Sequence, residues 1–346
     1  MAVYTELSKP ELADIVEDYS LVRLTAVSPI PHGSVNSNYC LETPRGRHVL
    51  RVDEVKGELD VKRELDLLVY LRKHGFPCPQ PVADRKGRWY RESRGKCVSV
   101  YRWLDGQVVG TDRLTAVRLE NVGRALADLH LIGKSYKKGI ENRFTYDRVA
   151  RLYADVRDRL PPYFRKVVRT LDDEVTYLEH YLENKLPKGI IHGDLFSDNL
   201  LFKGDKLVAM LDFEAACRGK FIFDLATAVN ALCVDSEGYD LKRFESLIAG
   251  YESLRPLSLA EWDAFPNELR LSALRFTVTR LCDFFLRPID ESARADKDFR
   301  EFYERLRILR RERDGGMEAL LMAMATGYDY RKYQRVKALE KKGSSR

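Results

Sequence analysis

The sequence lacks long apolar runs, and this absence excludes a membrane-spanning protein. Among its 346 residues no stretch approaches the roughly 18 uninterrupted apolar residues that a transmembrane helix needs. The first residues, Met1 to Ser8, also lack the basic and then apolar pattern of a secretory signal. We therefore expect neither export nor membrane insertion, and predict a cytoplasmic protein.

The sequence has few cysteines, and they are not paired. All six stand singly, without a C-x-x-C spacing or a pair of histidines nearby; they are Cys40, Cys78, Cys97, Cys217, Cys233 and Cys282. This distribution fits neither a zinc site nor a disulfide framework, so we expect ordinary thiols in a reducing compartment.

A continuous surplus of basic residues is also missing. The 59 lysines and arginines and 53 aspartates and glutamates give a net charge of +6. Seven of the basic residues and one acidic residue lie within 331–346, so the rest of the chain is balanced. Nucleic-acid binding needs a basic face, and we therefore expect no nucleic-acid partner and a solvated basic end.

The local pattern of the sequence changes near residue 105. Before it, β-favouring runs alternate with Gly, Pro and Asn, and one amphipathic helix is expected over Glu58–His74. After it, long helices are expected at 112–131, 163–182 and 259–286, the last with a break at Pro266. This order predicts an α+β protein with a small β-rich N-terminal lobe containing one helix and a larger helical C-terminal lobe.

The strongest local signal lies in a short β-rich patch, residues 190–212, among the predicted helices. His192-Gly193-Asp194 is followed by Asn199, and after a further apolar run by Asp212-Phe213-Glu214. Phosphoryl transfer uses such a set. One carboxylate accepts the proton of the attacking hydroxyl, while an amide oxygen and a second carboxylate hold the magnesium that bridges the nucleotide phosphates. The pattern therefore favours a kinase that uses ATP and Mg²⁺.

With these motifs the segment resembles the catalytic core of the aminoglycoside phosphotransferase and choline kinase superfamily, which has the two-lobed protein-kinase-like fold. The resemblance implies Asp194 as the catalytic base and Asn199 and Asp212 as magnesium ligands. It also implies that His192 braces the loop and that Asp224, in the following helix, anchors it.

Three features separate this chain from a protein kinase. Gly193 stands where the arginine that senses a phosphorylated activation segment would be, and Glu214 stands where a glycine would follow Phe213. The interval between Asp212 and Asp224 is too short for an activation segment. A small-molecule hydroxyl acceptor is therefore implied.

The resemblance also assigns residues of the N-terminal lobe to the nucleotide. The turn before the second β run lies where a kinase covers the phosphates with backbone N–H groups. Arg51 stands where the superfamily usually has a phosphate-pairing lysine, and Glu64 is the expected ion-pair partner. The planar guanidinium of Arg51 can donate two hydrogen bonds to phosphate oxygens. The backbone of Val98–Leu104 is expected to form the hinge that bonds the adenine edge. The remaining residues assigned to the nucleotide are Ser34, Asn36 and Ser37 in the turn and Tyr101 and Trp103 at the hinge.

A finer resemblance, to bacterial homoserine kinases of this fold, extends to about Arg313. It rests on segments outside the catalytic core as well as inside it. They include Met1–Thr5, Gly33–Asn38, Cys78–Val82, His130-Leu131, Glu141-Asn142, Val229-Asn230, Ala273–Phe276, Arg280-Leu281, Lys297–Phe299 and Phe302. The sequence departs from that family at Gly193, where alanine is frequent, at the pair of Arg51 and Glu64, and in the extension after Arg313.

The resemblance implies ATP-dependent phosphorylation of L-homoserine to O-phospho-L-homoserine, in threonine biosynthesis, by a monomer or homodimer. Homoserine carries a carboxylate and an ammonium besides its hydroxyl, so its site needs a cationic and an anionic group. Arg275 and Arg280 are candidates for the carboxylate, and Glu214 is the candidate for the ammonium. We expect residues 1–104 to bind the nucleotide phosphates, 105–313 to hold the catalytic loop and acceptor site, and 314–346 to form a basic extension.

Two alternatives stay open from the sequence. The first is a kinase for another hydroxyl acceptor, such as choline, ethanolamine, methylthioribose, an aminoglycoside or a protein serine. The second is a nucleotide-binding regulatory module of the same fold with little turnover, for which Arg51 in place of lysine is the only hint. The intact set of Asp194, Asn199 and Asp212 favours turnover.

Overall fold

The chain forms two compact units that are not simply its two halves. The computed structural model describes residues 5–30, 36–235, 238–286 and 298–311. The described residues within 1–107 and 200–214 form the first unit, and those within 108–199 and 215–346 form the second. The hairpin segment 200–214 therefore packs with the N-terminal unit, although almost a hundred residues of the second unit precede it.

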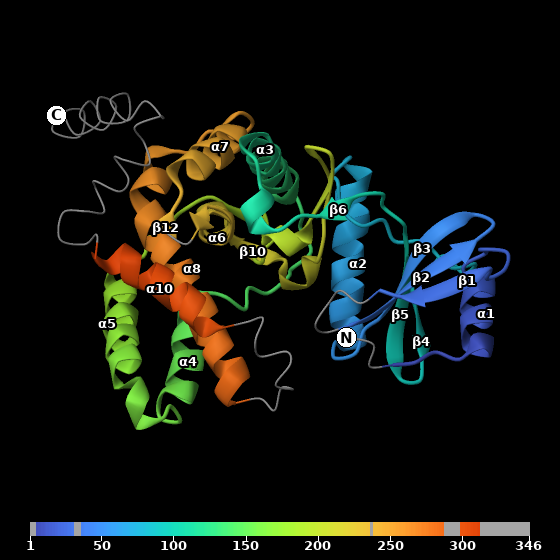
Figure 1. Cartoon of the computed structure of the whole chain (residues 1–346), viewed down its shortest axis with the longest axis horizontal. Coiled ribbons are helices and arrows are strands. Elements are labelled where there is room, and N and C mark those ends of the chain that lie inside the picture. The colour runs from blue at the N-terminus through green and yellow to red at the C-terminus, as the bar shows by residue number, and fades with distance from the viewer. Residues whose placement is uncertain (1–4, 31–35, 236–237, 287–297, 312–346) are drawn as a thin grey trace. The chain divides into compact units, whose positions relative to one another are not determined.

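The first unit contains an antiparallel sheet of order β1-β2-β3-β5-β4 (Figure 1). Its strands are β1 (Ala26–Pro29), β2 (Ser37–Thr43), β3 (Gly46–Val52), β4 (Tyr90–Ser93) and β5 (Lys96–Arg102). Side chains along β3 alternate, so that His48, Leu50 and Val52 are buried while the residues between them are partly exposed. The β structure predicted for this part of the sequence is confirmed. The sequence analysis did not single out β4, which the structure adds to the sheet.

Two helices accompany this sheet in the described part of the first unit, where the sequence predicted one. The predicted helix is α2 (Glu58–Lys73). The other, α1 (Lys9–Asp18), begins with a capping box between Ser8 and Glu11. It buries Leu12 and Ile15 in the cluster that includes the buried side chains of β2, β3 and β5. The S-x-x-E spacing was the signal for this helix, since it satisfies free N–H groups at a helix start.

The segment 200–214 adds a hairpin to the first unit. Strands β8 (Leu200–Lys203) and β9 (Lys206–Met210) pair with each other, and β6 (Gln107–Val108) lies beside β8. The Met210 N–H donates to the Pro77 carbonyl at 2.9 Å, and the Phe213 ring meets Phe76 edge-on at 6.2 Å between centroids. These contacts fix the end of β9, from which Asp212 follows.

The second unit is mainly helical. Its elements are α3 (Ala116–Gly133), α4 (Tyr146–Arg157), α5 (Arg165–Tyr181), α6 (Phe221–Leu232), α7 (Leu241–Glu252), α8 (Leu259–Phe285), α10 (Phe299–Arg311), the pair β7 (Lys188–Ile191) and β10 (Cys217–Lys220), and the pair β11 (Val234–Asp235) and β12 (Gly238–Tyr239). Helices α3 and α7 pack closely at two glycines. A Cβ on Gly123 would lie 2.0 Å from the Leu247 carbonyl oxygen, and one on Gly250 would lie 2.1 Å from that of Glu120.

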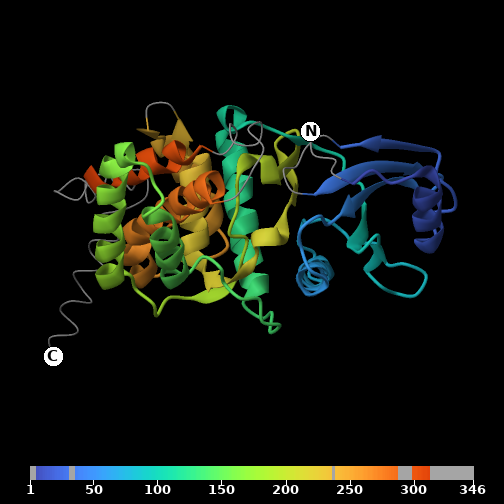
Figure 2. The ribbon, with the colours of Figure 1, turned by 90° about the horizontal axis from the view of Figure 1, so that it is seen from below.

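Helix α8 is central to the second unit and contacts α4, α5, α6 and α10 (Figures 1 and 2). It begins at a capping box of Ser258 and Glu261 and continues through Pro266, so the predicted break there is wrong. Proline removes one backbone hydrogen bond from a helix, but most helical stability in a folded protein comes from tertiary packing. Phe265 and Leu269, on either side of the proline, are fully buried, which holds the helix in place.

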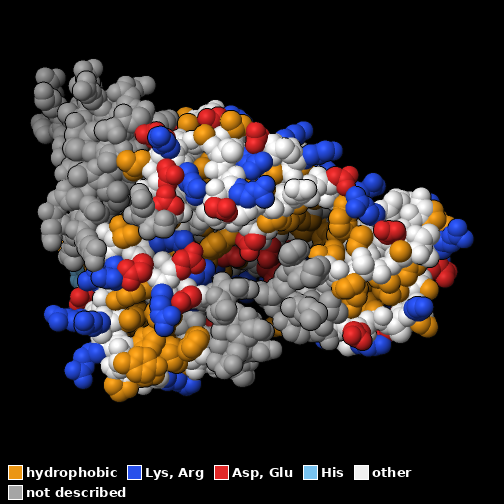
Figure 3. All heavy atoms as spheres, in the orientation of Figure 1, with side chains coloured by type: hydrophobic (Ala, Val, Ile, Leu, Met, Phe, Trp, Pro, Cys, Tyr) orange, Lys and Arg blue, Asp and Glu red, His pale blue; other side chains and the backbone are white. Residues whose placement is uncertain are grey.

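In the described residues no helix is both long and apolar enough to span a bilayer. All six cysteines are described, and each is a buried free thiol. Basic and acidic side chains are interspersed over the visible face in Figure 3.

Candidate active site

The loop after β7 is held by one buried carboxylate. Gly193 has φ of +76°, a left-handed conformation that glycine adopts without strain. In this turn the backbone N–H groups of His192 and Gly193 each donate to the carboxylate of Asp224 at 2.7 Å. His192 and Asp224 are completely buried, and the Asp194 N–H donates to His192 Nδ1 at 3.3 Å. The structure thus brings His192, Asp224 and the Asp194 backbone together.

A third group completes the surroundings of Asp224, and sequence reasoning gave it no role. His130, in α3, is fully buried and lies 3.0 Å from Asp224 through Nε2 and 2.7 Å from the Tyr251 hydroxyl through Nδ1. Arg255 can only donate, and it donates to the Tyr251 hydroxyl at 3.0 Å. The Tyr251 proton is therefore directed to Nδ1, and a neutral His130 donates from Nε2 to Asp224.

The charges on this network follow from its burial. Burial acts to raise the pKa of Asp224, but the hydrogen bonds that its carboxylate accepts from His130 and from the Gly193 N–H oppose burial, and that pKa is held below its ordinary value. Burial lowers the pKa of His130 in spite of the neighbouring carboxylate. A neutral imidazole beside an ionised carboxylate results, and the loop backbone is fixed by charge-assisted hydrogen bonds.

Asp194 presents its carboxylate from this fixed loop. Its side chain is 36% exposed, and its Oδ1 accepts from Arg275 Nη1 at 3.4 Å. Asn199 lies in a 3-10 turn, Ser197–Asn199, and its Nδ2 donates to the Asp194 carbonyl at 2.8 Å. The amide oxygen of Asn199 has no hydrogen-bond partner in the described part of the chain, which leaves it available to a ligand.

Asp212 belongs to the first unit and has an unusual backbone. Its φ is +55°, a left-handed conformation that is uncommon for residues other than glycine and frequent at functional sites. The Glu214 N–H donates to Asp212 Oδ1 at 3.3 Å, which closes a small side-chain turn. The carboxylate is thus oriented at the end of β9.

A cluster of charged side chains surrounds Arg51 in the first unit. The predicted pair is present, with Arg51 Nη1 at 3.1 Å from Glu64, and Arg51 also lies 3.6 Å from Glu214. Lys56 contacts the same two carboxylates and lies 3.0 Å from Glu214. Burial acts to lower the pKa of Lys56 and to raise that of Glu214, but the opposite charges outweigh it, so both groups stay ionised.

Lys56 and Asp53 complete this cluster, and the sequence analysis singled out neither. Lys56 lies between β3 and α2, five residues after Arg51, and its side chain is 15% exposed. Its proximity to Glu64 in the sequence was the only signal. Asp53 lies 3.6 Å from Lys56, and burial raises its pKa to about 6. The cluster therefore combines two cations with three carboxylates, one of which titrates close to neutral pH.

The turn residues assigned to the phosphates differ in their placement. Ser34 lies outside the described residues. Asn36 accepts from the Glu54 N–H at 3.2 Å and donates to the Glu214 carboxylate. The Ser37 hydroxyl is fully buried, donates to Glu54 at 2.5 Å and accepts from the Thr5 N–H at 3.1 Å. Asn36 thus belongs to the charged cluster, whereas Ser37 fixes the backbone beneath it.

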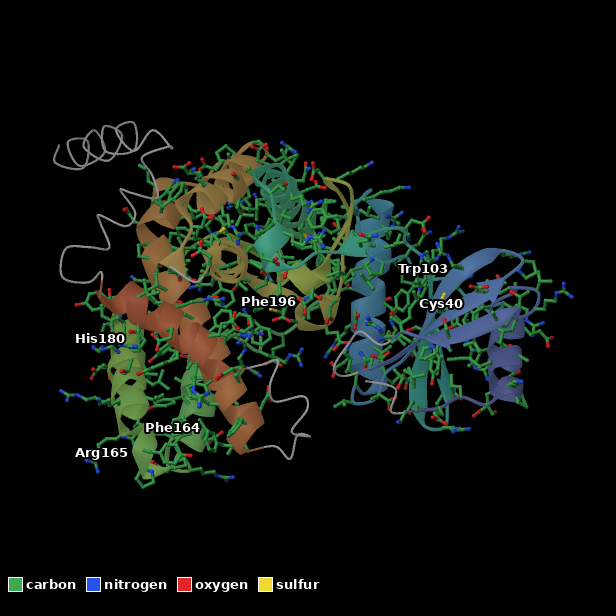
Figure 4. All side chains as sticks on the ribbon, in the orientation of Figure 1. Cys40, Trp103, Phe164, Arg165, His180 and Phe196 are labelled. Atoms are coloured by element: carbon green, nitrogen blue, oxygen red, sulfur yellow. The ribbon has the colours of Figure 1, made fainter. Side chains whose placement is uncertain are left out.

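The two hinge residues lie at the end of β5. Tyr101 is buried, and the Arg51 guanidinium lies 5.6 Å from its ring centroid. The backbone N–H of Trp103 donates to the Arg47 carbonyl at 3.3 Å. The Arg47 guanidinium lies 4.6 Å from the centroid of the Trp103 ring, which is labelled in Figure 4. Tyr101 therefore contacts the charged cluster, while Trp103 is held by the neighbouring strand.

The three acceptor candidates have different neighbours. Arg275 is 5% exposed, lies between the rings of Phe144 and Phe276 at 3.9 and 3.7 Å, and reaches Asp194. Arg280 donates to the Asp298 carbonyl at 2.8 Å and to Glu301 at 2.6 Å. Both arginines belong to the second unit with Asp194, whereas Glu214 is paired within the first unit.

The donor set fits magnesium. Carboxylate and amide oxygens are hard ligands, and Mg²⁺ is commonly held by one or two protein groups together with substrate phosphates. Asn199 of the second unit carries an amide oxygen of this kind, and Asp212 of the first unit carries a carboxylate of this kind. No group of three or more His, Cys, Asp or Glu side chains suited to a metal occurs among the described residues, and a phosphate-bridging magnesium does not need one.

The fold and these motifs define the class of protein. A model of the phosphotransferase enzyme family matches residues 26–257, about two thirds of the chain, and the chain belongs to this family. The predicted superfamily and the protein-kinase-like α+β fold are confirmed.

The relatives are more specific. A homoserine kinase of Caulobacter sp. (strain K31) is 37% identical over 313 residues, covering 90% of this chain and 97% of that protein. A homoserine kinase of Methylobacterium radiotolerans is 36% identical over 91% of this chain and 98% of its own length. The resemblance to homoserine kinases seen in the sequence is therefore confirmed.

Solved structures agree on the fold. A microcompartment-associated aminopropanol kinase superposes with a TM-score of 0.68 at 20% identity and covers 89% of this chain and 98% of its own. An amicoumacin kinase, in complex with AMP-PNP and Ca²⁺, superposes with a TM-score of 0.64 at 17% identity, over 86% of this chain and 92% of its own.

Proposed function

We propose that this protein is a homoserine kinase that transfers the γ-phosphoryl group of ATP to the hydroxyl of L-homoserine. The observation that carries the proposal is the geometry of Asp194, a partly exposed carboxylate on a loop whose backbone is fixed by Asp224. Relatives named homoserine kinase, 36 and 37% identical over nine tenths of the chain, support this acceptor.

In this proposal the residues of the second unit handle the acceptor and its proton. The homoserine oxygen attacks the γ-phosphorus, the bond to the ADP oxygen breaks, and the hydroxyl proton passes to a carboxylate oxygen of Asp194. Arg275 orients that carboxylate through its bond to Oδ1. His192, Asp224 and His130 keep the loop backbone in place while the proton moves.

The residues of the first unit hold the nucleotide in this proposal. Arg51 and Lys56 bind phosphate oxygens, and Glu64 and Glu214 orient the two cations. Asn199 and Asp212 would hold Mg²⁺, which neutralises the charge that develops on the phosphates. We assign binding of the nucleotide phosphates to residues 1–104, assisted by Asn199, Asp212 and Glu214, and the catalytic loop and acceptor site to residues 105–313.

A coupled assay of ADP release tests the acceptor. The purified protein is supplied with MgATP and, separately, with L-homoserine, 3-aminopropanol, choline, ethanolamine, methylthioribose and an aminoglycoside. We expect the largest kcat/KM for homoserine. A larger value for any other acceptor contradicts the proposal, and ATP binding without turnover of any acceptor supports the regulatory alternative.

The Asp194→Asn variant tests the proposed base. The amide cannot take up the hydroxyl proton, and general-base catalysis contributes about 10²- to 10⁴-fold, so we expect kcat to fall by at least about 100-fold. ATP affinity, measured by calorimetry, should stay close to that of the wild type. Asp205→Asn, in the exposed turn between β8 and β9, is the matched control and should keep full activity. Equal turnover by both variants would exclude Asp194 as the base.

A further inference from the structure

An aromatic side chain that the sequence analysis did not single out lies beside the catalytic loop. Phe144 is in the connection between α3 and α4, two residues after Asn142, and its ring is only partly buried. A Cβ on Gly193 would lie 3.5 Å from Phe144 Cε2, so the ring is close to the backbone of the turn that carries Asp194. Phe144 therefore borders the turn that presents the proposed base.

The loop that carries Phe144 is anchored on strand β10. The Phe144 N–H donates to Asn142 Oδ1 at 2.7 Å, which closes a side-chain turn. The Arg218 N–H, in β10, donates to the Ile140 carbonyl at 3.1 Å. A Cβ on Gly219, the next residue of β10, would lie 3.0 Å from Asn142 Nδ2. Because β10 pairs with β7, which leads into the catalytic loop, the Phe144 ring is held at a fixed place beside that loop.

Phe144 and Phe276 enclose the guanidinium of Arg275, whose Cζ lies 3.9 and 3.7 Å from the two ring centroids. The Phe276 ring is fixed in turn by Phe196 and Phe302, with centroids 5.0 and 4.5 Å away. A guanidinium is planar and weakly hydrated, so it stacks well on aromatic faces, and the attraction is stronger where water is excluded. Phe144 thus supplies the second of two faces that hold one cation.

These faces matter because Arg275 has few hydrogen bonds. Its side chain is buried, and its one hydrogen bond to the described residues, from Nη1 to Asp194, is long at 3.4 Å. Its Nε is buried without a partner in the part of the chain that the structure describes. Burial lowers the pKa of Arg275, although Asp194 opposes the effect, and an arginine stays protonated nonetheless. One long bond does not fix such a group, so its position depends on the rings.

We propose that Phe144 is a positioning residue for phosphoryl transfer: its ring, opposite that of Phe276, holds the Arg275 guanidinium where Nη1 reaches Asp194. The inference rests on the proposed function, in which Arg275 orients the Asp194 carboxylate. It adds a residue that acts on the reaction through Arg275.

The test begins with Phe144→Leu and Phe144→Tyr. Leucine keeps an apolar side chain but removes the ring face, and we expect kcat for homoserine to fall about tenfold, since a cation–π contact shielded from water favours the correct Arg275 position by about this factor. The KM values for homoserine and for ATP should stay within about twofold of the wild type. Tyrosine keeps the ring face, and Phe144→Tyr should retain the kcat of the wild type.

Phe164→Leu is the matched control for a loss of packing. Phe164 is a buried phenylalanine of the second unit that meets Phe285 edge-on, with ring centroids 5.3 Å apart. Figure 4 labels it well away from Phe196 of the catalytic loop. This variant should lower the free energy of unfolding in urea but leave kcat unchanged, so it separates a loss of stability from a loss of position.

A double-mutant cycle with Arg275→Met tests whether Phe144 acts through the arginine. Arg275→Met alone should lower kcat at least as much as Phe144→Leu does. In the Arg275→Met background, Phe144→Leu should lower kcat by less than about twofold, because the group that the ring holds is gone. Arg275→Gln replaces Arg275→Met in the cycle if that variant does not fold.

Three results would overturn the inference. They are a wild-type kcat in Phe144→Leu, an equal loss of kcat with and without Arg275, and a raised homoserine KM with unchanged kcat, which would make the ring a wall of the acceptor site. If the wild type prefers another acceptor, the homoserine assignment fails, and the same cycle with that acceptor decides on Phe144. If homoserine is phosphorylated and the cycle shows no coupling, only the positioning role fails. Absence of turnover with every acceptor removes both.

Discussion

Two buried arginine sites in the second unit differ in how many of their donors are used. Arg270 makes a bidentate pair with Glu174, with Nε–Oε1 at 2.7 Å and Nη2–Oε2 at 2.5 Å, and its guanidinium lies 3.8 Å from the Tyr177 ring centroid. Arg305 makes one bond to Glu301 and leaves two donors unpaired among the described residues. Both side chains come from helices that pack on each other, α8 and α10.

The difference separates an arginine that forms a two-bond ion pair from one that forms a single bond. At Arg270 two donors are matched by a carboxylate that is itself fully buried, and Arg310 Nη1 also lies 3.7 Å from that carboxylate. At Arg305 the shared carboxylate is 46% exposed and must also serve Arg280. Burial alone therefore does not show how completely an arginine is paired.

The largest effect should come from breaking the matched pair. Glu174→Gln leaves Arg270 as a buried charge without its counterion, and such changes cost about 3 to 5 kcal/mol of folding free energy. Urea unfolding of the variant measures this loss. Glu179→Gln, at an exposed position of the same helix, should be neutral. A loss below about 1 kcal/mol would remove the distinction between the two arginine sites.

The next effect concerns Asp53 of the first unit, a buried carboxylate whose Oδ1 has no hydrogen bond among the described residues. Burial raises its pKa to about 6 from 3.8, so the folded state binds the proton more tightly than the unfolded chain. Its contribution to stability is fully present below about pH 4 and is lost as the pH rises through about 6, a change of roughly 2 to 3 kcal/mol. The positive charges of Arg51 and Lys56 act to lower the pKa of Asp53, and the value of about 6 already contains their effect.

The Asp53→Asn variant should remove that pH dependence. Urea unfolding from pH 4.5 to 8 should show the stability of the variant, relative to the wild type, rising by about 2 kcal/mol across the range. Asp60→Asn, at an exposed position of α2, should give a constant difference. A constant difference for Asp53→Asn would show that this carboxyl ionises at its ordinary pKa.

A smaller effect is expected at Lys56, whose ammonium the proposal assigns to the nucleotide phosphates. Lys56→Met should weaken ATP and ADP binding about tenfold, or about 1.4 kcal/mol, because one charge-assisted contact is lost. Binding of adenosine, which has no phosphate, should not change. Lys62→Met, which removes an exposed lysine of α2 paired with Asp66, is the control. An equal loss for adenosine would point to a general disturbance of the first unit.

The smallest effect should come from Glu301→Gln, the counterpart of the first prediction. Because Glu301 is nearly half exposed, water screens its charge, and we expect a loss of only about 1 kcal/mol. Glu304→Gln serves as the control for chain stability. A loss as large as that of Glu174→Gln would mean that Arg305 is a fold-stabilising residue like Arg270.

Much of the fold and part of the candidate site could be predicted because the signals are local. The helix over 58–73 follows from apolar residues at three- and four-residue steps, and the turn at Gly193 follows from residues adjacent in the chain. The pairing of Arg51 with Glu64 was predicted from the resemblance to the superfamily, which places an ion-pair partner on the helix after the strand. The break at Pro266 was predicted wrongly because a local rule was applied to a helix that tertiary packing supports.

By itself the sequence determined which chemical groups are present and how they follow one another: Asp194 and Asn199 in one loop, and Asp212 at the end of a strand. Only the tertiary structure decided which distant groups meet them. His130 contacts Asp224, which lies 94 residues away in the sequence, and it contacts Tyr251, which lies 121 residues away. Arg280 and Glu301 lie 21 residues apart and on different helices, yet they share one ion pair. Such contacts depend on how helices pack, which is set by the sum of many buried side chains, so no short pattern in the chain can specify them.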